Sequence, residues 1–296
     1  QSQLQLNNDL WQALDHDELR LFYQPKYCAP SGPILGFEAL LRWQHPQRGL
    51  LSPDKFLPMA EKTGMIVNIG NWVIHEACRQ LRQWHLQGHP HWSVAVNLSA
   101  LQFEQSNLVK TVVDALEKHQ IPAELLTLEV TETTAMRDPD ESVRILTELT
   151  QLGVKASIDD FGTGYSSLLY LKRLPASELK IDRAFVNELQ HHTEDATIVS
   201  AIVALAQSLQ LKVVAEGVET AEQQAFLTSL GCNTLQGYLL GKPVPPERVP
   251  ELADYVVAEI EEAIAEVSLN AEAEAEAEAE AEAEAGQPLT PQVAVI

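Results

Sequence analysis

Polar side chains that could bind a metal ion follow the short apolar segments of this 296-residue chain. Most are carboxylates, joined by two amides and one lysine: Glu38, Asn97, Glu129, Glu132, Asp159, Asp160, Lys180, Asp182, Glu216, Glu219 and Gln236. If the fold gathers them, like charges raise their pKa values or destabilise the protein unless cations bind. Oxygen ligands suit Mg²⁺ or Mn²⁺ far better than Zn²⁺. The spacing therefore predicts a divalent-cation site.

The segment Asp159-Asp160-Phe161-Gly162-Thr163-Gly164 is the strongest single signal. Its adjacent acids leave an apolar strand, and two glycines that permit tight turns follow, which suits a metal site under a mobile loop. An isolated acid at a strand end is more often a cap or an ion-pair partner. The inference of a site therefore depends on the whole set.

Strand and helix patterns alternate along about 250 residues. Apolar, β-rich segments occupy residues 21–27, 34–43, 92–98, 125–130, 155–159, 179–181, 212–215 and 234–239. Helical spacing of apolar residues occupies residues 72–86, 108–117, 142–152, 198–209 and 221–230. This alternation predicts one (β/α)₈ barrel, with the polar strand ends on its catalytic rim. A doubly wound open sheet is the alternative.

The first two predicted strands are separated only by residues 28–33, which include Pro-Ser-Gly-Pro. So short a gap permits a hairpin but no helical crossover. We therefore expect one strand to run antiparallel to the others.

Charge is concentrated at the C-terminal end of the chain. The formal net charge is −22, and residues 251–296 hold 13 acidic residues and no Lys or Arg. This balance excludes a nucleic-acid-coating protein, and no apolar run reaches the length of a membrane span. Residues 271–285 alternate Ala and Glu, which predicts a solvated, disordered tail.

These patterns predict a lead-in helix or linker at 1–18, a barrel domain at 19–265 and an acidic tail at 266–296. The start at Gln1, without Met or a signal pattern, suggests a fragment of a longer protein with an upstream domain. Three widely spaced cysteines fit neither a disulfide framework nor a metal site and indicate the cytoplasm. His85, His89 and His91 are interpreted as turn residues.

The ordered set of motifs resembles the EAL domain phosphodiesterases, which hydrolyse the bacterial second messenger cyclic di-GMP. The similarity runs from about Leu19 to Pro250. It rests on Glu38-Ala39-Leu40 with Arg42, Asn97-Leu98-Ser99, Glu129-x-Thr131-Glu132, Asp159-Asp160-Phe161-Gly162-Thr163-Gly164, Leu179-Lys180-Ile181-Asp182, Glu216-Gly217-Val218-Glu219 and Gln236-Gly237-Tyr238.

The resemblance implies a modified TIM barrel with one antiparallel strand and two bound cations, Mg²⁺ or Mn²⁺. One cation would be held by Glu38, Asn97, Glu129 and Asp159. Asp159 would bridge to a second cation, held also by Asp160 and by Glu216 directly or through water. Ca²⁺ is expected to bind without supporting turnover.

The resemblance also implies roles for other residues. Lys180 would contact the attacking water and the developing phosphorane charge, and Glu216 would activate the water. Arg42 would clamp phosphate, with Gln24, Leu40 and Asp182 as further substrate contacts. Glu132 and Glu219 would support the Asp159 loop and the metal ligands, and Gln236 would orient waters at the metal site.

The predicted activity is hydrolysis of cyclic di-GMP to linear pGpG. The alternative is a receptor that binds cyclic di-GMP without hydrolysing it, and an enolase-like barrel is a remote third hypothesis. Expected partners are a second copy of the chain, paired through residues 165–173, and an upstream sensory or GGDEF domain; no nucleic-acid polymer is expected. The expected location is the cytoplasm, as a free protein or as the cytoplasmic domain of a membrane-anchored one.

Overall fold

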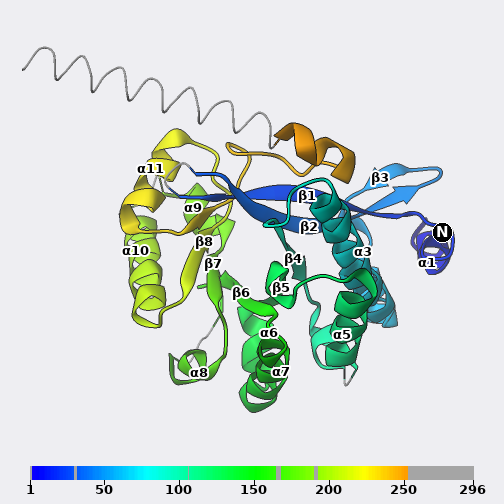
Figure 1. The fold of residues 1–296 in the computed structure, drawn as a ribbon, viewed down its shortest axis with the longest axis horizontal. Helices are drawn as coiled ribbons and strands as arrows, with labels where there is room; N and C mark the ends of the chain where they lie inside the picture. Colours follow the sequence, from blue (N-terminus) through cyan, green and yellow to red (C-terminus); the bar gives the residue numbers. More distant parts are fainter. Residues whose placement is uncertain (1, 30–31, 106, 165–167, 190–192, 253–296) are drawn as a thin grey trace, which may run out of the picture. The chain divides into compact units, whose positions relative to one another are not determined.

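The apolar segments of the sequence form a nine-stranded sheet that closes on itself through pairing of its first two strands (Figure 1). The computed structural model describes residues 2–29, 32–105, 107–164, 168–189 and 193–252. Neighbouring strands follow the order β1-β9-β8-β7-β6-β5-β4-β2-β3, and the additional β1–β2 pairing closes the barrel. The strands are β1 (Leu19–Cys28), β2 (Ile34–His45), β3 (Gly49–Leu51), β4 (Ser93–Asn97), β5 (Leu126–Thr131), β6 (Lys155–Phe161), β7 (Glu178–Ile181), β8 (Lys212–Ala215) and β9 (Thr234–Leu235).

Strand β1 runs antiparallel to both of its neighbours, β2 and β9, whereas the pairs from β2 and β4 round to β8 and β9 are parallel. The hairpin predicted from the short gap at 28–33 is thus confirmed. Because β1 is reversed, its beginning lies at the end of the barrel where the other strands finish. Gln24 is paired in register with Glu38 of β2, close to that end.

Helices surround the barrel in Figure 1 and bury their apolar faces against it. They are α1 (Ser2–Ala13), α2 (Leu57–Thr63), α3 (Ile66–Leu86), α4 (Ala100–Phe103), α5 (Leu108–His119), α6 (Glu132–Arg137), α7 (Pro139–Gln151), α8 (Leu168–Arg173), α9 (Arg183–Asn187), α10 (Thr193–Ser208) and α11 (Ala221–Leu230). Three short 3₁₀ turns lie at Pro53–Lys55, Ala123–Leu125 and Pro246–Arg248.

The hydrophobic core fills the space between the helices and the outer faces of the strands. Trp84 of α3 is fully buried, and its ring lies 4.8 Å from Tyr23 and 5.5 Å from Trp92 in edge-on contacts. Such offset aromatic contacts stabilise a core beyond simple burial. Trp84 is therefore a packing residue.

The N-terminal helix is fastened to the barrel by polar contacts. Nε2 of buried His45, at the end of β2, lies 3.2 Å from Oδ2 of Asp9 in α1. Next to it, the indole nitrogen of Trp43 donates a hydrogen bond to Glu18, at 2.9 Å. These contacts link the 1–18 segment to β2.

One predicted strand, 234–239, is shorter in the structure and ends at Leu235. Gly237 lies so close to another loop that a Cβ there would come within 2.2 Å of the backbone of Val218. Backbone hydrogen bonds to Val218 replace the sheet pairing. The short strand β3 and the first turns of α3 and α10 were not predicted. Residues 253–265, the acidic tail and the pair His191–His192, whose polar sequence surroundings predict a solvated loop, lie outside the described residues.

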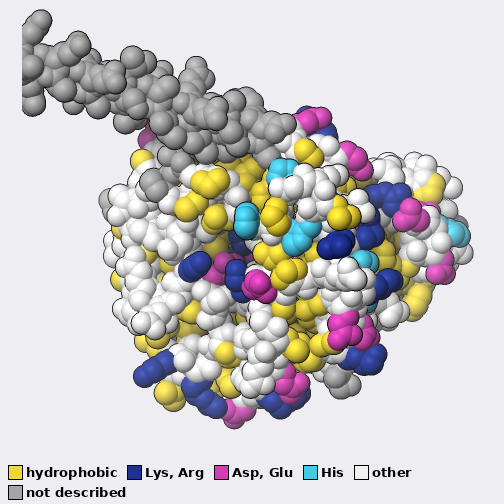
Figure 2. Space-filling view, in the orientation of Figure 1, with side chains coloured by type: hydrophobic (Ala, Val, Ile, Leu, Met, Phe, Trp, Pro, Cys, Tyr) yellow, Lys and Arg dark blue, Asp and Glu magenta, His cyan; other side chains and the backbone are white. Residues whose placement is uncertain are grey.

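The described surface carries mixed charge. On the face shown in Figure 2, acidic and basic side chains are interspersed with apolar ones. Among the described residues, no helix is both long and apolar enough to cross a membrane.

Candidate active site

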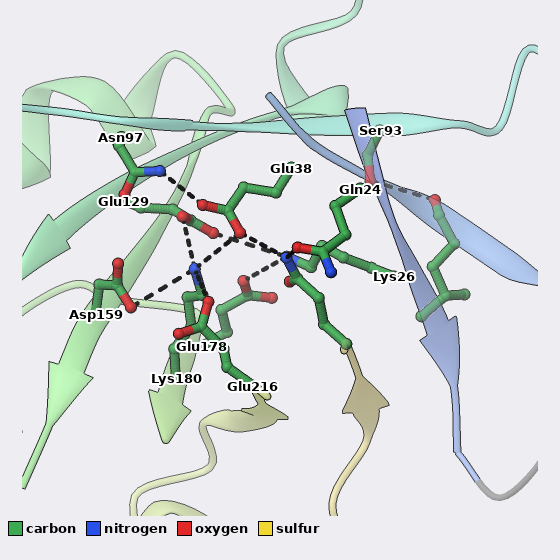
Figure 3. A network of polar contacts seen from close by, with 12 residues as sticks. Gln24, Lys26, Glu38, Ser93, Asn97, Glu129, Asp159, Glu178, Lys180 and Glu216 are labelled. Carbon is green, nitrogen blue, oxygen red and sulfur yellow. Dashed lines mark hydrogen bonds and ion pairs between the residues drawn. The ribbon is translucent and has the colours of Figure 1, made fainter. Parts of the chain in front are cut away.

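The predicted site residues meet at the end of the barrel where the parallel strands finish (Figure 3). Each of six neighbouring strands brings one residue: Glu38, Asn97, Glu129, Asp159 and Lys180 come from β2, β4, β5, β6 and β7, and Glu216 directly follows β8. Above them opens a cavity of about 340 Å³. Its lining is Gln24, Glu38, Leu40, Arg42, Asp159, Asp160, Asp182, Arg183, Glu216, Gly217, Glu219, Gln236, Gly237, Tyr238 and Pro243.

Lys180 lies at the centre of this group and is fully buried. Its Nζ donates a hydrogen bond to Oε2 of Glu129 at 2.7 Å and pairs with Oε1 of Glu216 at 2.6 Å. Carboxylate oxygens of Glu38 and Asp159 each lie 3.5 Å from the same nitrogen. Burial opposes the charge on Lys180, but the surrounding carboxylates outweigh burial and raise the pKa of the ammonium well above its usual value.

Glu38 is held in place by two amides. Asn97 donates a hydrogen bond to Oε1 of Glu38 at 2.7 Å, and Gln236 donates one to Oε2 at 2.6 Å. Nε2 of Gln236 also lies 3.1 Å from Oε1 of Gln24, whose own amide donates to the carbonyl of Gly241. Gln236, for which the resemblance implies a role in orienting water, thus links Gln24 of β1 to Glu38 of β2.

Asp159, Asp160 and Glu216 form a group whose ligand oxygens lie within 4.8 Å of one another. Burial, with the nearby charge of Asp159, raises the pKa of Asp160 to about 7. Burial also raises the pKa of Glu216 to about 7, although Lys180 opposes the shift. Burial is the larger cause of both shifts, and neighbouring carboxylates add to it; a bound cation would favour the ionised form of both groups.

The donor chemistry fits divalent cations. One carboxylate oxygen of buried Glu129, Oε1, accepts no hydrogen bond within the described part of the chain. The amide nitrogen of Asn97 is engaged by Glu38, which leaves its carbonyl oxygen as the possible ligand. Carboxylate and amide oxygens in such numbers are the donors that Mg²⁺ and Mn²⁺ prefer.

Glu132 supports the loop that follows Asp159 and Asp160. It begins α6 and is buried, and its Oε2 accepts hydrogen bonds from the backbone nitrogens of Gly162 at 2.9 Å and Gly164 at 3.3 Å. Asp160 itself has a positive φ of 52°, an uncommon conformation for a residue with a side chain. The carboxylate of Glu132 therefore fixes a strained turn next to the metal-ligand candidates.

The remaining predicted residues line the cavity wall. Arg42 is half-buried, and its guanidinium lies 5.6 Å from the centre of the Phe22 ring. Asp182 accepts a hydrogen bond from the backbone nitrogen of Ala184 and so also caps α9. The structure brings Leu40 and Glu219 to the same wall.

Sequence analysis assigned no role to four charged or aromatic residues near the site, although Tyr238 belongs to the motif Gln236-Gly237-Tyr238. Arg183 and Tyr238 line the cavity, and Lys26 and Glu178 lie beneath it. Lys26 could have been found from strand alternation, because it follows Gln24 by two residues and shares its face of β1. Arg183 directly follows Asp182 but carries no independent signal.

Comparison with known proteins matches most of the chain to the EAL domain, the family that the sequence motifs resemble. The model of the EAL domain matches residues 7–243. The bifunctional diguanylate cyclase/cyclic di-GMP phosphodiesterase MucR of Pseudomonas aeruginosa is 64% identical over 249 residues, covering 84% of this chain and 36% of that protein. The cyclic di-GMP phosphodiesterase NbdA of the same organism is 49% identical over 243 residues, covering 82% of this chain and 31% of that protein. The chain thus spans about a third of these relatives.

Solved structures extend the similarity to three dimensions. A phosphodiesterase described as PaMucR, in complex with c-di-GMP, matches with a TM-score of 0.81 and 64% identity, over 83% of this chain and 99% of that one. The FimX EAL domain from Pseudomonas aeruginosa, bound to c-di-GMP, matches with a TM-score of 0.74 and 28% identity, over 80% of this chain and 95% of that one. By sequence, fold and site, the chain belongs to the EAL domain family.

Proposed function

We propose that the chain is a metal-dependent phosphodiesterase that opens one phosphodiester of cyclic di-GMP to give linear pGpG. The observation that carries the proposal is the convergence of Glu38, Glu129, Asp159 and Glu216 on Lys180, below a cavity that Arg42 also lines. Carboxylates of this number suit cations, and a guanidinium suits a phosphate. The cyclic di-GMP phosphodiesterases among the relatives support the choice of substrate.

Two sets of side chains would hold the cations. Glu38, Asn97, Glu129 and Asp159 make up one, and Asp159, Asp160 and Glu216 make up the other. Divalent cations bound there supply an activated water and stabilise the charge that develops on phosphorus.

The chain's own groups bind the substrate and move protons. Arg42 binds a phosphate through its planar, permanently charged fork. Glu216, whose carboxylate lines the cavity, would take a proton from the attacking water. In the reaction, water adds to phosphorus, the bond from phosphorus to the 3′ oxygen breaks, and that oxygen gains a proton. Lys180, which the surrounding carboxylates keep charged, would stabilise the phosphoryl charge.

Incubation of the purified chain with cyclic di-GMP tests the proposal. With Mg²⁺ or Mn²⁺, chromatography should show conversion to pGpG, and EDTA should abolish it. Binding of cyclic di-GMP with no conversion in either metal would instead support the receptor hypothesis. If the chain neither binds cyclic di-GMP nor converts it to product, both the phosphodiesterase and the receptor hypotheses are excluded.

A further inference from the structure

We infer that Glu178 is a positioning residue that holds Lys26 away from Glu129, so that one oxygen of Glu129 stays available to a cation. The inference rests on the proposed metal-dependent function and concerns residues outside the cavity lining. Figure 3 shows Lys26 and Glu178 joined to the polar network that includes Glu129 and Lys180.

The pair belongs to a layer of polar residues beneath the site. Side chains two positions apart on a strand point to the same side of the sheet. The residues two positions below the site on β5, β6 and β7 are Thr127, Ser157 and Glu178, and on reversed β1 the corresponding residue is Lys26. Thr127, Ser157 and Lys26 are buried, and the Glu178 side chain is 14% exposed. The barrel interior is therefore polar below the catalytic residues as well as at their level.

Lys26 lies between two carboxylates at unequal distances. Its Nζ donates a hydrogen bond to Oε1 of Glu178 at 3.1 Å, whereas Oε1 of Glu129 lies 3.9 Å away. The longer distance is beyond a hydrogen bond, and that Glu129 oxygen accepts none within the described residues. The other oxygen of Glu129 is already engaged by Lys180 at 2.7 Å. Glu129 thus keeps one bonded and one unbonded oxygen.

The contact with Glu178 prevents Lys26 from closing on Glu129. A buried ammonium needs an acceptor, and Glu129 is the nearest alternative to Glu178. Burial opposes ionisation of Glu178, but Lys26 outweighs burial and lowers the pKa of the carboxyl, so Glu178 remains a charged acceptor. Without Glu178, Lys26 would gain a hydrogen bond to Glu129 and occupy the oxygen that a cation needs.

Fold stability alone does not explain the pair. Replacing a buried ion pair by apolar residues of similar size is often neutral or stabilising. Partners that orient a metal ligand, by contrast, typically affect metal affinity roughly 10- to 100-fold. Holding Lys26 away from Glu129, so that this ligand stays available, accounts for two charges placed beneath the site.

Mn²⁺ affinity in the absence of substrate is the direct test, measured from the paramagnetic resonance signal of free Mn²⁺. Glu178→Leu removes the acceptor and should weaken Mn²⁺ binding roughly 10- to 100-fold. Glu178→Gln loses the same charge but keeps an acceptor for Lys26, and should stay within about threefold of the unmodified chain. Lys26→Met/Glu178→Leu removes both groups, and with them the competitor, and should also stay within about threefold.

Two further variants guard against a loss of folding. His45→Ala breaks the buried contact with Asp9, far along β2 from Glu38, and should lower thermal stability without changing Mn²⁺ affinity. If Glu178→Leu does not fold, Glu178→Ser takes its place, because a hydroxyl too short to reach Lys26 leaves room for water at this partly exposed position. It should weaken Mn²⁺ binding like the leucine variant.

Three results would overturn the inference. The first is that Glu178→Leu or Glu178→Ser binds Mn²⁺ as tightly as the unmodified chain. The second is that the leucine and glutamine variants lose equal Mn²⁺ affinity. The third is that Lys26→Met/Glu178→Leu binds Mn²⁺ no better than Glu178→Leu. These results are distinct from those expected if the proposed function is wrong, because the unmodified chain itself would then neither bind Mn²⁺ nor hydrolyse cyclic di-GMP.

Discussion

Nζ of Lys180 lies 2.6 Å from Oε1 of Glu216, so the two groups expected to act on the attacking water form an ion pair in which the lysine is fully buried. The pair couples their charges: Lys180 opposes the rise in the pKa of Glu216, and Glu216 helps to keep Lys180 protonated. A change at either residue therefore alters the other. Variants of Lys180 and Glu216 must therefore be compared by both substrate affinity and turnover.

Lys180→Ala should abolish most turnover while preserving substrate binding. Lys180 does not line the cavity, and loss of a donor to developing charge costs about 3 to 4 kcal/mol of transition-state stabilisation. Turnover in Mg²⁺ should fall several hundred-fold, with cyclic di-GMP affinity in Ca²⁺ nearly unchanged. Arg42→Ala is the matched control, because it should weaken affinity as well as rate. A near-normal rate in Lys180→Ala would refute the assignment of the lysine.

Metal removal should destabilise Lys180→Ala more than the unmodified chain. Lys180 places one positive charge within 3.5 Å of oxygens from four carboxylates. Removing one partner of a buried ionic group costs about 3 to 5 kcal/mol. Thermal melts should show most of this loss in EDTA and a smaller loss in saturating Mn²⁺, where cations replace part of the charge. Equal losses in the two conditions would contradict this picture.

Glu132→Ala should slow turnover roughly 10- to 100-fold, since it removes the acceptor that fixes Gly162 and Gly164 beside the candidate ligands. Glu132→Gln keeps an oxygen that can accept these hydrogen bonds and should retain most activity. The measurement is kcat with saturating Mn²⁺ and substrate. Equal activity of the alanine and glutamine variants would show that the loop contact does not matter for catalysis.

The cysteines should differ in reactivity. Burial raises the pKa of both Cys78 and Cys232 to about 12, whereas Cys28 is partly exposed. Only thiolates react readily, so a thiol reagent at pH 8 should label Cys28 alone until the chain unfolds. Buried thiols also lower stability as pH rises from the usual 9.0 towards about 12, because the unfolded thiols ionise first. Rapid labelling of Cys78 in folded protein would disprove this.

A homodimer remains a prediction. In α8, the side chains of Leu168 and Leu169 are 60% and 68% exposed, which is unusual for adjacent leucines on a helix. Light scattering should give twice the chain mass at tens of micromolar. Leu168→Glu/Leu169→Glu should give a monomer, and Leu50→Glu, at another exposed leucine, should not. A monomeric mass for the unmodified chain would reject the prediction.

The sequence predicted the barrel and the meeting of the polar strand ends because both follow from local patterns. Strand and helix alternation predicts a barrel without excluding an open sheet, and the short gap at 28–33 predicts the reversed strand; the carboxyl ends of parallel strands share one rim in a closed barrel. Asp159 and Lys180 could therefore be placed together before their contact was known. Their separation of 3.5 Å depends on side-chain packing and could not.

The missed features depend on contacts between distant segments. Lys26 and Glu178 are 152 positions apart, and a single charged residue in a short strand is ordinarily interpreted as exposed. The early end of β9 follows from the close approach of Gly237 to Val218. Strand alternation could have indicated the face on which Lys26 lies, but neither its pairing with Glu178 nor the end of β9 leaves a local pattern in the sequence.

The reversed direction of β1 has a mechanical consequence. The strand begins at Leu19, on the catalytic side of the barrel, and its backbone is bonded along its length to β2 and at Tyr23 to Val244. A pull on the segment before Leu19 would load these hydrogen bonds in shear, all at once, because force and strand share one axis. Gln24 is only five positions from the point of loading and reaches Glu38 through Gln236. Tension that passes α1 and its contact with His45 would therefore reach the carboxylates with no further helix in between.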